Sequence, residues 1–204
     1  MKIEIGLNKK SIKNAIKQLR TVKYNFDIAR KDFLEGVALW LIERANFYLS
    51  NSDIGEIVKL DIRNGWIYDF TPIGVKITNS AEKAVYVEFG VGVVGQSQSH
   101  PNASAEGYEY NVESASKNDD GSWTFFTNKE NLDLPKNSIF VDRNFGGSRG
   151  RGGEYGERLQ ITTRGAKGVW YAYNAIVDAK MELAKPNGGE IGLIWQKSKM
   201  RYIK

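Results

Sequence analysis

Apolar residues recur at helical spacing near the start of the chain and predict two helices there. The first is expected from Asn8 to Tyr24, and the second from about Asp27 or Ala29 to Leu49. The second has the wider apolar stripe, so we expect it to supply most of the core. Trp40 lies on the flank of that stripe, where it either covers the edge of the core or meets a neighbouring subunit.

The apolar period changes to two between Ile54 and Asn79, which predicts two or three short antiparallel strands. One strand is expected around Ile57–Ile62, and two more at Trp66–Phe70 and Gly74–Thr78. The dipeptide Asn64-Gly65 has the composition of a hairpin turn.

A glycine-rich and polar region begins at Gly90 and extends to about Gly168. Gly90–Gly95 has the composition of a loop. Two alternating segments, Tyr108–Ser114 and Ser122–Thr127, predict a β-hairpin, and a short strand is expected at Ser138–Val141. Asn144–Gly153 is expected to be a mobile loop, because it is dominated by glycine.

Helical spacing returns from Ala166 or Gly168 and stops at Pro186. The following segment, Ile191–Trp195, is expected to be a terminal strand or a segment that becomes ordered only on a partner. Trp195 is therefore a candidate contact residue.

Composition limits the class of protein. The chain has 204 residues, 41% of them apolar, which is enough for a folded core. It has no cysteine, which excludes disulfides, thiolate metal sites and a cysteine nucleophile. The longest apolar run, Gly36–Ile42, is far shorter than a membrane helix, so no membrane association is expected.

Basic residues are concentrated at both ends of the chain. Met1 to Phe26 contains seven Lys or Arg and one Glu, Lys180 to Lys204 contains six and two, and the segment between them is net −5. The first expected helix carries six cations and no acid: Lys9, Lys10, Lys13, Lys17, Arg20 and Lys23. Such a face either docks on phosphate or on an acidic protein ring, or is simply solvated.

A second basic element is the loop Arg149-Gly150-Arg151-Gly152-Gly153. Arginines on a glycine backbone can follow phosphates and stack on bases. The alternatives are a loop that becomes ordered against the next subunit and a disordered loop, and we favour these two together.

Sequence signatures of catalysis are missing. His100 is the only histidine, so a catalytic triad or a multi-histidine metal site would depend on it alone, and we expect it to be a surface loop residue. Asp119-Asp120 is explained by a turn. An all-carboxylate magnesium nuclease would leave no local signature, and nothing favours one. We expect no enzymatic activity, no cofactor and no metal.

The segment from Ala84 to Gly90 sets one carboxylate, Glu88, among apolar residues. Because an unpaired buried charge is costly, Glu88 is expected to fix a fold-defining or subunit-facing contact through backbone N–H groups or a basic side chain. The alternative is a solvated glutamate on the polar face of a short helix.

This segment resembles the A-x-Y-V-E-F-G signature of the small neck proteins of long-tailed bacteriophages, the tail-completion or head-to-tail connector family. The resemblance extends over about Ile12 to Gly90 and Gly165 to Ala184, and Val91 stands where the family usually has Thr. The matching motif residues are Ala84, Tyr86, Val87, Glu88, Phe89 and Gly90.

The pattern and the resemblance together lead us to expect an α+β protein, with N-terminal helices packed on a small antiparallel sheet, an inserted β-rich arm and a C-terminal helix. Residues 1–90 and 165–204 would form the core domain, and residues 91–164 the inserted arm.

The resemblance also implies a non-enzymatic virion protein that is assembled in the cytoplasm of the bacterial host. Copies of the chain would form a homo-oligomeric ring between head and tail. Its partners would be a portal-side connector and the tail terminator or tube proteins, and contact with DNA in the channel is left open. The alternative function is nucleic-acid binding by the basic first helix and by Arg149 and Arg151.

Overall fold

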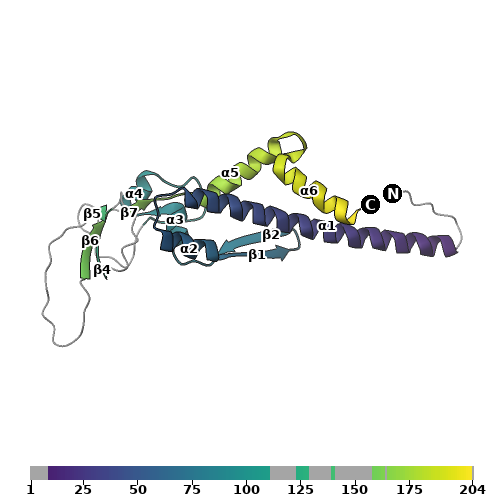
Figure 1. The fold of residues 1–204 in the computed structure, drawn as a ribbon, viewed down its shortest axis with the longest axis horizontal. Helices are drawn as coiled ribbons and strands as arrows, with labels where there is room; N and C mark the ends of the chain where they lie inside the picture. Colours follow the sequence, from purple (N-terminus) through teal and green to yellow (C-terminus); the bar gives the residue numbers. More distant parts are fainter. Residues whose placement is uncertain (1–8, 111–122, 129–138, 141–157, 164, 204) are drawn as a thin grey trace, which may run out of the picture. The chain divides into compact units, whose positions relative to one another are not determined.

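The computed structural model describes residues 9–110, 123–128, 139–140, 158–163 and 165–203, which form a mixed α+β fold (Figure 1). The expected fold class is therefore confirmed. The helices are α1 (Lys9–Ser50), α2 (Glu56–Asn64), α3 (Ala84–Phe89), α4 (Gly92–Ser97), α5 (Tyr171–Ala184) and α6 (Gly189–Tyr202). The strands are β1 (Trp66–Thr71), β2 (Gly74–Asn79), β3 (Gly90–Val91), β4 (Trp123–Asn128), β5 (Ile139–Phe140), β6 (Arg158–Thr163) and β7 (Gly165–Lys167).

The described strands form three small sheets, with the orders β1-β2, β3-β7 and β4-β6-β5. Packing divides the chain into two compact units. The first contains residues 1–44, 67–78 and 175–204, and the second contains residues 45–66 and 79–174. The expected division into a core domain (residues 1–90 and 165–204) and an inserted arm (residues 91–164) stays a prediction.

The first unit is built on α1. We expected two helices here, and that was wrong, because α1 runs without a break through residues 25–27. This stretch, Asn25-Phe26-Asp27, contains neither Gly nor Pro, and its residues cost a helix only about 0.7 kcal/mol each. Phe26 also packs edge-to-face against Trp195, with ring centroids 6.3 Å apart, which favours the helical course.

α6 packs against α1 through the Phe33 and Trp195 rings, and it lies at an angle to α1 in the view of Figure 1. A Cβ on Gly36 would lie 2.5 Å from Ile194 Cγ2, so the two helices approach each other closely at this glycine. The terminal strand expected at residues 191–195 was wrong, because Ile191 and Ser198 are both buried, seven residues apart, as on one helix face. The alternation that suggested a strand fits this helix equally well.

The hairpin β1–β2 also belongs to the first unit, and both of its strands were predicted. It turns at Pro72-Ile73, between the two expected strands. Its contacts with α1 include a hydrogen bond from the Tyr68 hydroxyl to Glu35 (2.8 Å) and one from Arg30 to the Pro72 carbonyl (2.7 Å).

The strand expected around Ile57–Ile62 was wrong, because this segment is the helix α2 of the second unit. Val58 and Ile62 are both buried and lie four residues apart, as helical packing requires. Lys59 is buried as well, and its amine donates to the Ser50 carbonyl (3.2 Å) and to Glu56 (2.9 Å). Gly65 ends this helix, which explains why Asn64-Gly65 is not a hairpin turn.

The region after Gly90 differs from the expected loop, since it forms β3 and α4. Strands near Ser122–Thr127 and Ser138–Val141 are confirmed as β4 and β5, but both pair with β6, which we did not predict. Residues 111–122 of the expected hairpin and the loop Asn144–Gly153 lie outside the described residues. The C-terminal helix α5 is confirmed, but it begins at Tyr171 because Gly165–Lys167 pairs with β3.

None of the helices in the described ranges combines the length and the apolar composition that a membrane span requires.

Candidate functional site

The A-x-Y-V-E-F-G segment forms α3 and the first residue of β3. Ala84, Val87 and Glu88 are buried, which is the i, i+3, i+4 pattern of one helix face. Tyr86 is 51% exposed on the other side. The motif therefore directs its carboxylate into the second unit and not into solvent.

Glu88 accepts hydrogen bonds from the first turn of α5. Its Oε2 accepts a hydrogen bond from the Ala172 N–H (2.8 Å), and its Oε1 accepts one from the Tyr173 N–H (2.9 Å). The first N–H groups of a helix have no acceptor within the helix, and a carboxylate there also meets the positive end of the helix dipole. Val169 and Trp170, which precede α5, offer no side-chain oxygen. Glu88 therefore caps α5 from a distant part of the chain.

This geometry confirms the expected contact of Glu88 through backbone N–H groups. The alternative of a solvated glutamate was wrong, because Glu88 is only 8% exposed.

His100 is the third partner of Glu88, a contact that was not predicted from the sequence. Its Nε2 lies 3.1 Å from Glu88 Oε1, and its Nδ1 accepts a hydrogen bond from the Asn102 N–H (3.0 Å). Because Nδ1 accepts a hydrogen bond, the proton of the neutral ring is assigned to Nε2. The Nε2–H group then donates a hydrogen bond to the Glu88 carboxylate. The expectation of a surface loop histidine was wrong, since His100 is 4% exposed.

Aromatic rings enclose this histidine. The ring centroid of Phe89 lies 4.3 Å from that of His100, that of Tyr173 lies 5.2 Å away and that of Trp170 lies 5.8 Å away. The signal for this arrangement was present in the sequence as the aromatic run Val169-Trp170-Tyr171-Ala172-Tyr173 and as a single histidine. We call Glu88, His100, Phe89, Trp170 and Tyr173 the Glu88 cluster.

The glycine of the motif is required by its backbone. Gly90 has φ 84° and ψ 178°, a region open essentially to glycine alone. A Cβ there would collide with the backbone nitrogen of Gly168 and lie 2.7 Å from the Ala166 carbonyl oxygen. The Gly90 carbonyl accepts a hydrogen bond from the Tyr108 hydroxyl (2.6 Å), and burial raises the pKa of Tyr108 to about 12.

Further hydrogen bonds attach the motif to the segment before α5. The Val169 N–H donates to the Val87 carbonyl (2.8 Å), and the Trp170 N–H donates to the Glu88 carbonyl (3.2 Å). The Tyr171 hydroxyl donates to the Ala84 carbonyl (3.2 Å), and burial, with a smaller effect of Glu88, raises the pKa of Tyr171. The cluster thus holds α3, the loop at His100 and the start of α5 together.

The chemistry available to this cluster is limited by its hydrogen bonds. Both ring nitrogens of His100 and both carboxylate oxygens of Glu88 already have partners within the chain. In the part of the chain that the structure describes, no group of three or more His, Cys, Asp or Glu is arranged to hold a metal ion. The arrangement is suited to fixing the fold.

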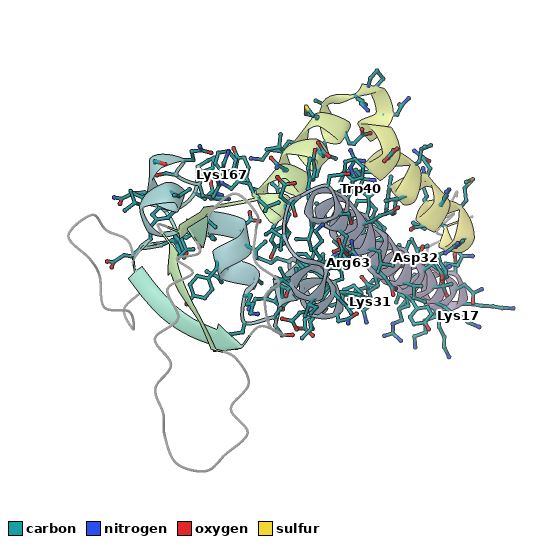
Figure 2. The ribbon with its side chains drawn as sticks, turned by 60° about the vertical axis from the view of Figure 1, so that its left-hand side comes forward. Lys17, Lys31, Asp32, Trp40, Arg63 and Lys167 are labelled. Carbon is teal, nitrogen blue, oxygen red and sulfur yellow. The ribbon has the colours of Figure 1, made fainter. Side chains whose placement is uncertain are left out.

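Three of the expected interface residues follow the i, i+4, i+7 spacing of one helix face. Lys13, Lys17 and Arg20 are exposed on the N-terminal half of α1, and Figure 2 shows Lys17 extending away from the helix. Arg149 and Arg151 lie outside the described residues.

The two expected tryptophans pack within the first unit. The Trp40 indole N–H donates to Glu190 of α6 (2.7 Å), and its ring lies 5.8 Å from the Arg44 guanidinium carbon. The Trp195 ring lies 5.5 Å from Phe33. These contacts all lie within α1 or between α1 and α6 of the same chain.

Large apolar side chains are exposed on several elements. On α1 they include Ile12, Ile16 and Leu19, which are 44%, 46% and 52% exposed. Ile73 at the tip of the hairpin is 95% exposed. Ile57 and Leu60 of α2, at 67% and 56%, were missed as surface residues, because we expected a strand there.

Comparison with known proteins adds no relative, since no family model, no curated protein and no solved structure matches this chain.

Proposed function

We propose that this chain is a ring-forming structural subunit of the neck of a long-tailed bacteriophage, where it joins the portal side of the head to the tail. The observation that carries the subunit role is the repeated exposure of large apolar side chains on α1, α2 and the β1–β2 hairpin. Large apolar side chains that lie next to one another on one face of an element mark a binding surface, because their burial is the main favourable term in association.

The neck assignment rests on the resemblance of residues 84–90 to the A-x-Y-V-E-F-G signature. The geometry of that segment supports a structural role for it. Glu88, the motif's only carboxylate, caps α5 and binds His100, so its oxygens are engaged inside the chain. A buried, fully engaged carboxylate serves stability and not chemistry on a substrate.

On this proposal the chain has no enzymatic activity and needs no cofactor. Its partners are further copies of itself, a portal-side connector and the tail terminator or tube proteins, and it works in the virion after assembly in the host cytoplasm.

The experiment is a mass measurement on the full chain, alone and after addition of portal-side or tail proteins. We expect closed oligomers of defined mass in at least one of these conditions. A strict monomer in all of them would contradict the proposal.

Nucleic-acid binding is the second candidate, favoured by the exposed cations of α1. Six Lys or Arg lie between Lys9 and Lys23 without an acid among them, and all six are exposed. A salt titration separates the two functions, because phosphate contacts release counterions and their affinity falls steeply with salt. Tight, salt-sensitive DNA or RNA binding by the monomer would favour this second function over a purely structural one.

A further inference from the structure

The N-terminal half of α1 exposes an apolar row with cations beside it. Ile12, Ile16 and Leu19 follow the i, i+4, i+7 spacing of one helix face and are each about half exposed. In Figure 1 these first turns of α1, drawn in purple, have neither α6 nor the hairpin beside them. The cations that border the row are Lys9, Lys13, Arg20 and Lys23. We call this surface the α1 row.

α2 exposes an apolar pair with carboxylates beside it. Ile57 and Leu60 lie on the side of the helix opposite the buried Val58 and Ile62. Exposed carboxylates border this apolar pair on both sides, and a third precedes the helix: Glu56, Asp61 and Asp53. Glu56 is also paired with Lys59 (2.9 Å), so Asp53 and Asp61 contribute most of the negative charge. We call this surface the α2 patch.

We propose that the α1 row of one copy binds the α2 patch of a second copy, and that this contact repeats around the ring. The inference rests on the proposed function and names the surfaces that close its oligomer. The two surfaces match because apolar side chains lie in the middle of each and charges of opposite sign lie at the edges, where they fix orientation and exclude wrong partners.

The two surfaces are different, so the contact is head-to-tail. Every copy then uses its α1 row on one neighbour and its α2 patch on the other, which produces a closed ring if the rotation between copies closes. The same contact accounts for the charge pattern of the chain, in which a basic start precedes an acidic middle segment.

A second copy fits these surfaces better than the other candidate partners. Nucleic acid would engage the cations of the α1 row but leave Ile12, Ile16 and Leu19 in water. An anionic membrane could accept the whole row. Both would repel the acidic α2 patch, whereas a second copy covers both surfaces with one kind of contact.

Charge reversal in the full chain tests this contact. One variant carries Lys13→Glu and Arg20→Glu, and the other carries Asp53→Lys and Asp61→Lys. Each variant alone sets like charges against each other, so we expect association weakened by about tenfold or more. An equimolar mixture should recover the parent's association, because each reversed surface then meets its reversed complement and each unchanged surface meets an unchanged one.

Two control variants reverse an exposed charge elsewhere on the chain. One carries Asp69→Lys on β1, and the other carries Lys76→Glu on β2. These variants should associate like the parent.

Cysteine cross-linking locates the contact, and the chain has no cysteine of its own. Chains with Ile16→Cys and chains with Leu60→Cys are mixed and oxidised. We expect disulfide dimers that contain one chain of each kind, whereas Ile73→Cys chains mixed with Leu60→Cys chains should give few.

The outcomes separate this inference from the proposed function. If the parent forms rings and each charge-reversal variant also forms them alone, the inference is overturned and the proposed function stands. If the parent stays monomeric with every neck partner, the proposed function itself fails. If Lys13→Glu with Arg20→Glu abolishes binding to DNA or to anionic vesicles but leaves self-association unchanged, the α1 row serves that other partner and the inference is overturned.

Discussion

The Glu88 cluster and the N-terminal half of α1 differ in where their charged groups lie, buried in the cluster and exposed on α1. In the cluster, one carboxylate is buried and receives two backbone N–H groups and one imidazole. On the N-terminal half of α1, by contrast, six cations remain exposed, and so do the apolar side chains of Ile12, Ile16 and Leu19. The difference teaches that the segment that resembles a family signature supports the fold from within. The surfaces that we propose for assembly lie on other elements, α1 and α2, and measurements on variants separate these two roles.

The largest effect is expected for Glu88→Ala. The substitution leaves the Ala172 and Tyr173 N–H groups and the His100 Nε2–H buried without an acceptor, at a cost of about 3–5 kcal/mol in the free energy of unfolding. Urea unfolding measures this cost. Glu82→Ala, at an exposed position just before the motif, is the matched control and should change stability by less than about 0.5 kcal/mol. Equal stability of both variants would mean that the cluster does not support the fold.

Gly90→Ala should cost about 2 kcal/mol or more, because it adds a backbone collision to a strained backbone region. Gly107→Ala is the control. Gly107 also has a positive φ, 64°, but a Cβ there meets no atom within 4 Å, so we expect about 1 kcal/mol. Thermal unfolding of the two variants compares them, and a larger loss at Gly107 would contradict the packing described around Gly90.

Alkaline pH should weaken the second unit through Tyr108. Burial raises the pKa of its phenol from the ordinary value of 10 to about 12, so the folded state keeps a proton that the unfolded state has already lost. This contribution to stability is complete below about pH 10 and is lost as the pH rises towards 12.

The measurement for Tyr108 is the urea midpoint across that pH window. Tyr108→Phe should reduce the slope, and Tyr171, whose pKa is raised as well, should account for part of what remains. An unchanged slope in Tyr108→Phe would contradict the buried phenol.

The smallest effect on stability is expected on the α1 row. Ile16→Ser at an exposed position should change the free energy of unfolding of the monomer by less than about 0.5 kcal/mol. The same variant should associate less than the parent in a concentration series. A large loss of monomer stability would show that Ile16 belongs to the core, and would remove the contrast between α1 and the Glu88 cluster.

The elements that could be predicted from the sequence are those with a strong and long pattern. The helical character of α1, the strands β1 and β2 and the helix α5 all follow from periodicity, and so does the need of Glu88 for backbone donors. The cost of an unpaired buried charge is general, which is why it could be argued without knowing the fold.

The remaining features depend on tertiary contacts. In α2 and α6 the apolar residues fit a period of two as well as a helical one, and only the burial of Val58, Ile62 and Ile191 decides between them. His100 has no local pattern that marks it as buried, because its partners are 12 residues or more away in Glu88 and Tyr173. The α2 patch was not predicted, because a strand was expected at Ile57–Ile62 and Ile57 and Leu60 share a face only in a helix.

The central claim is that copies of this chain close into a ring, and single-particle electron microscopy of the assembled chain tests it most directly. The account predicts class averages with cyclic symmetry around an open channel, formed by the parent or by the parent with a neck partner. It also predicts closed rings, in which the two kinds of chain alternate, from the equimolar mixture of the two charge-reversal variants, and far fewer rings from either variant alone at the same concentration. Monomers or open chains without cyclic symmetry in every sample would contradict it.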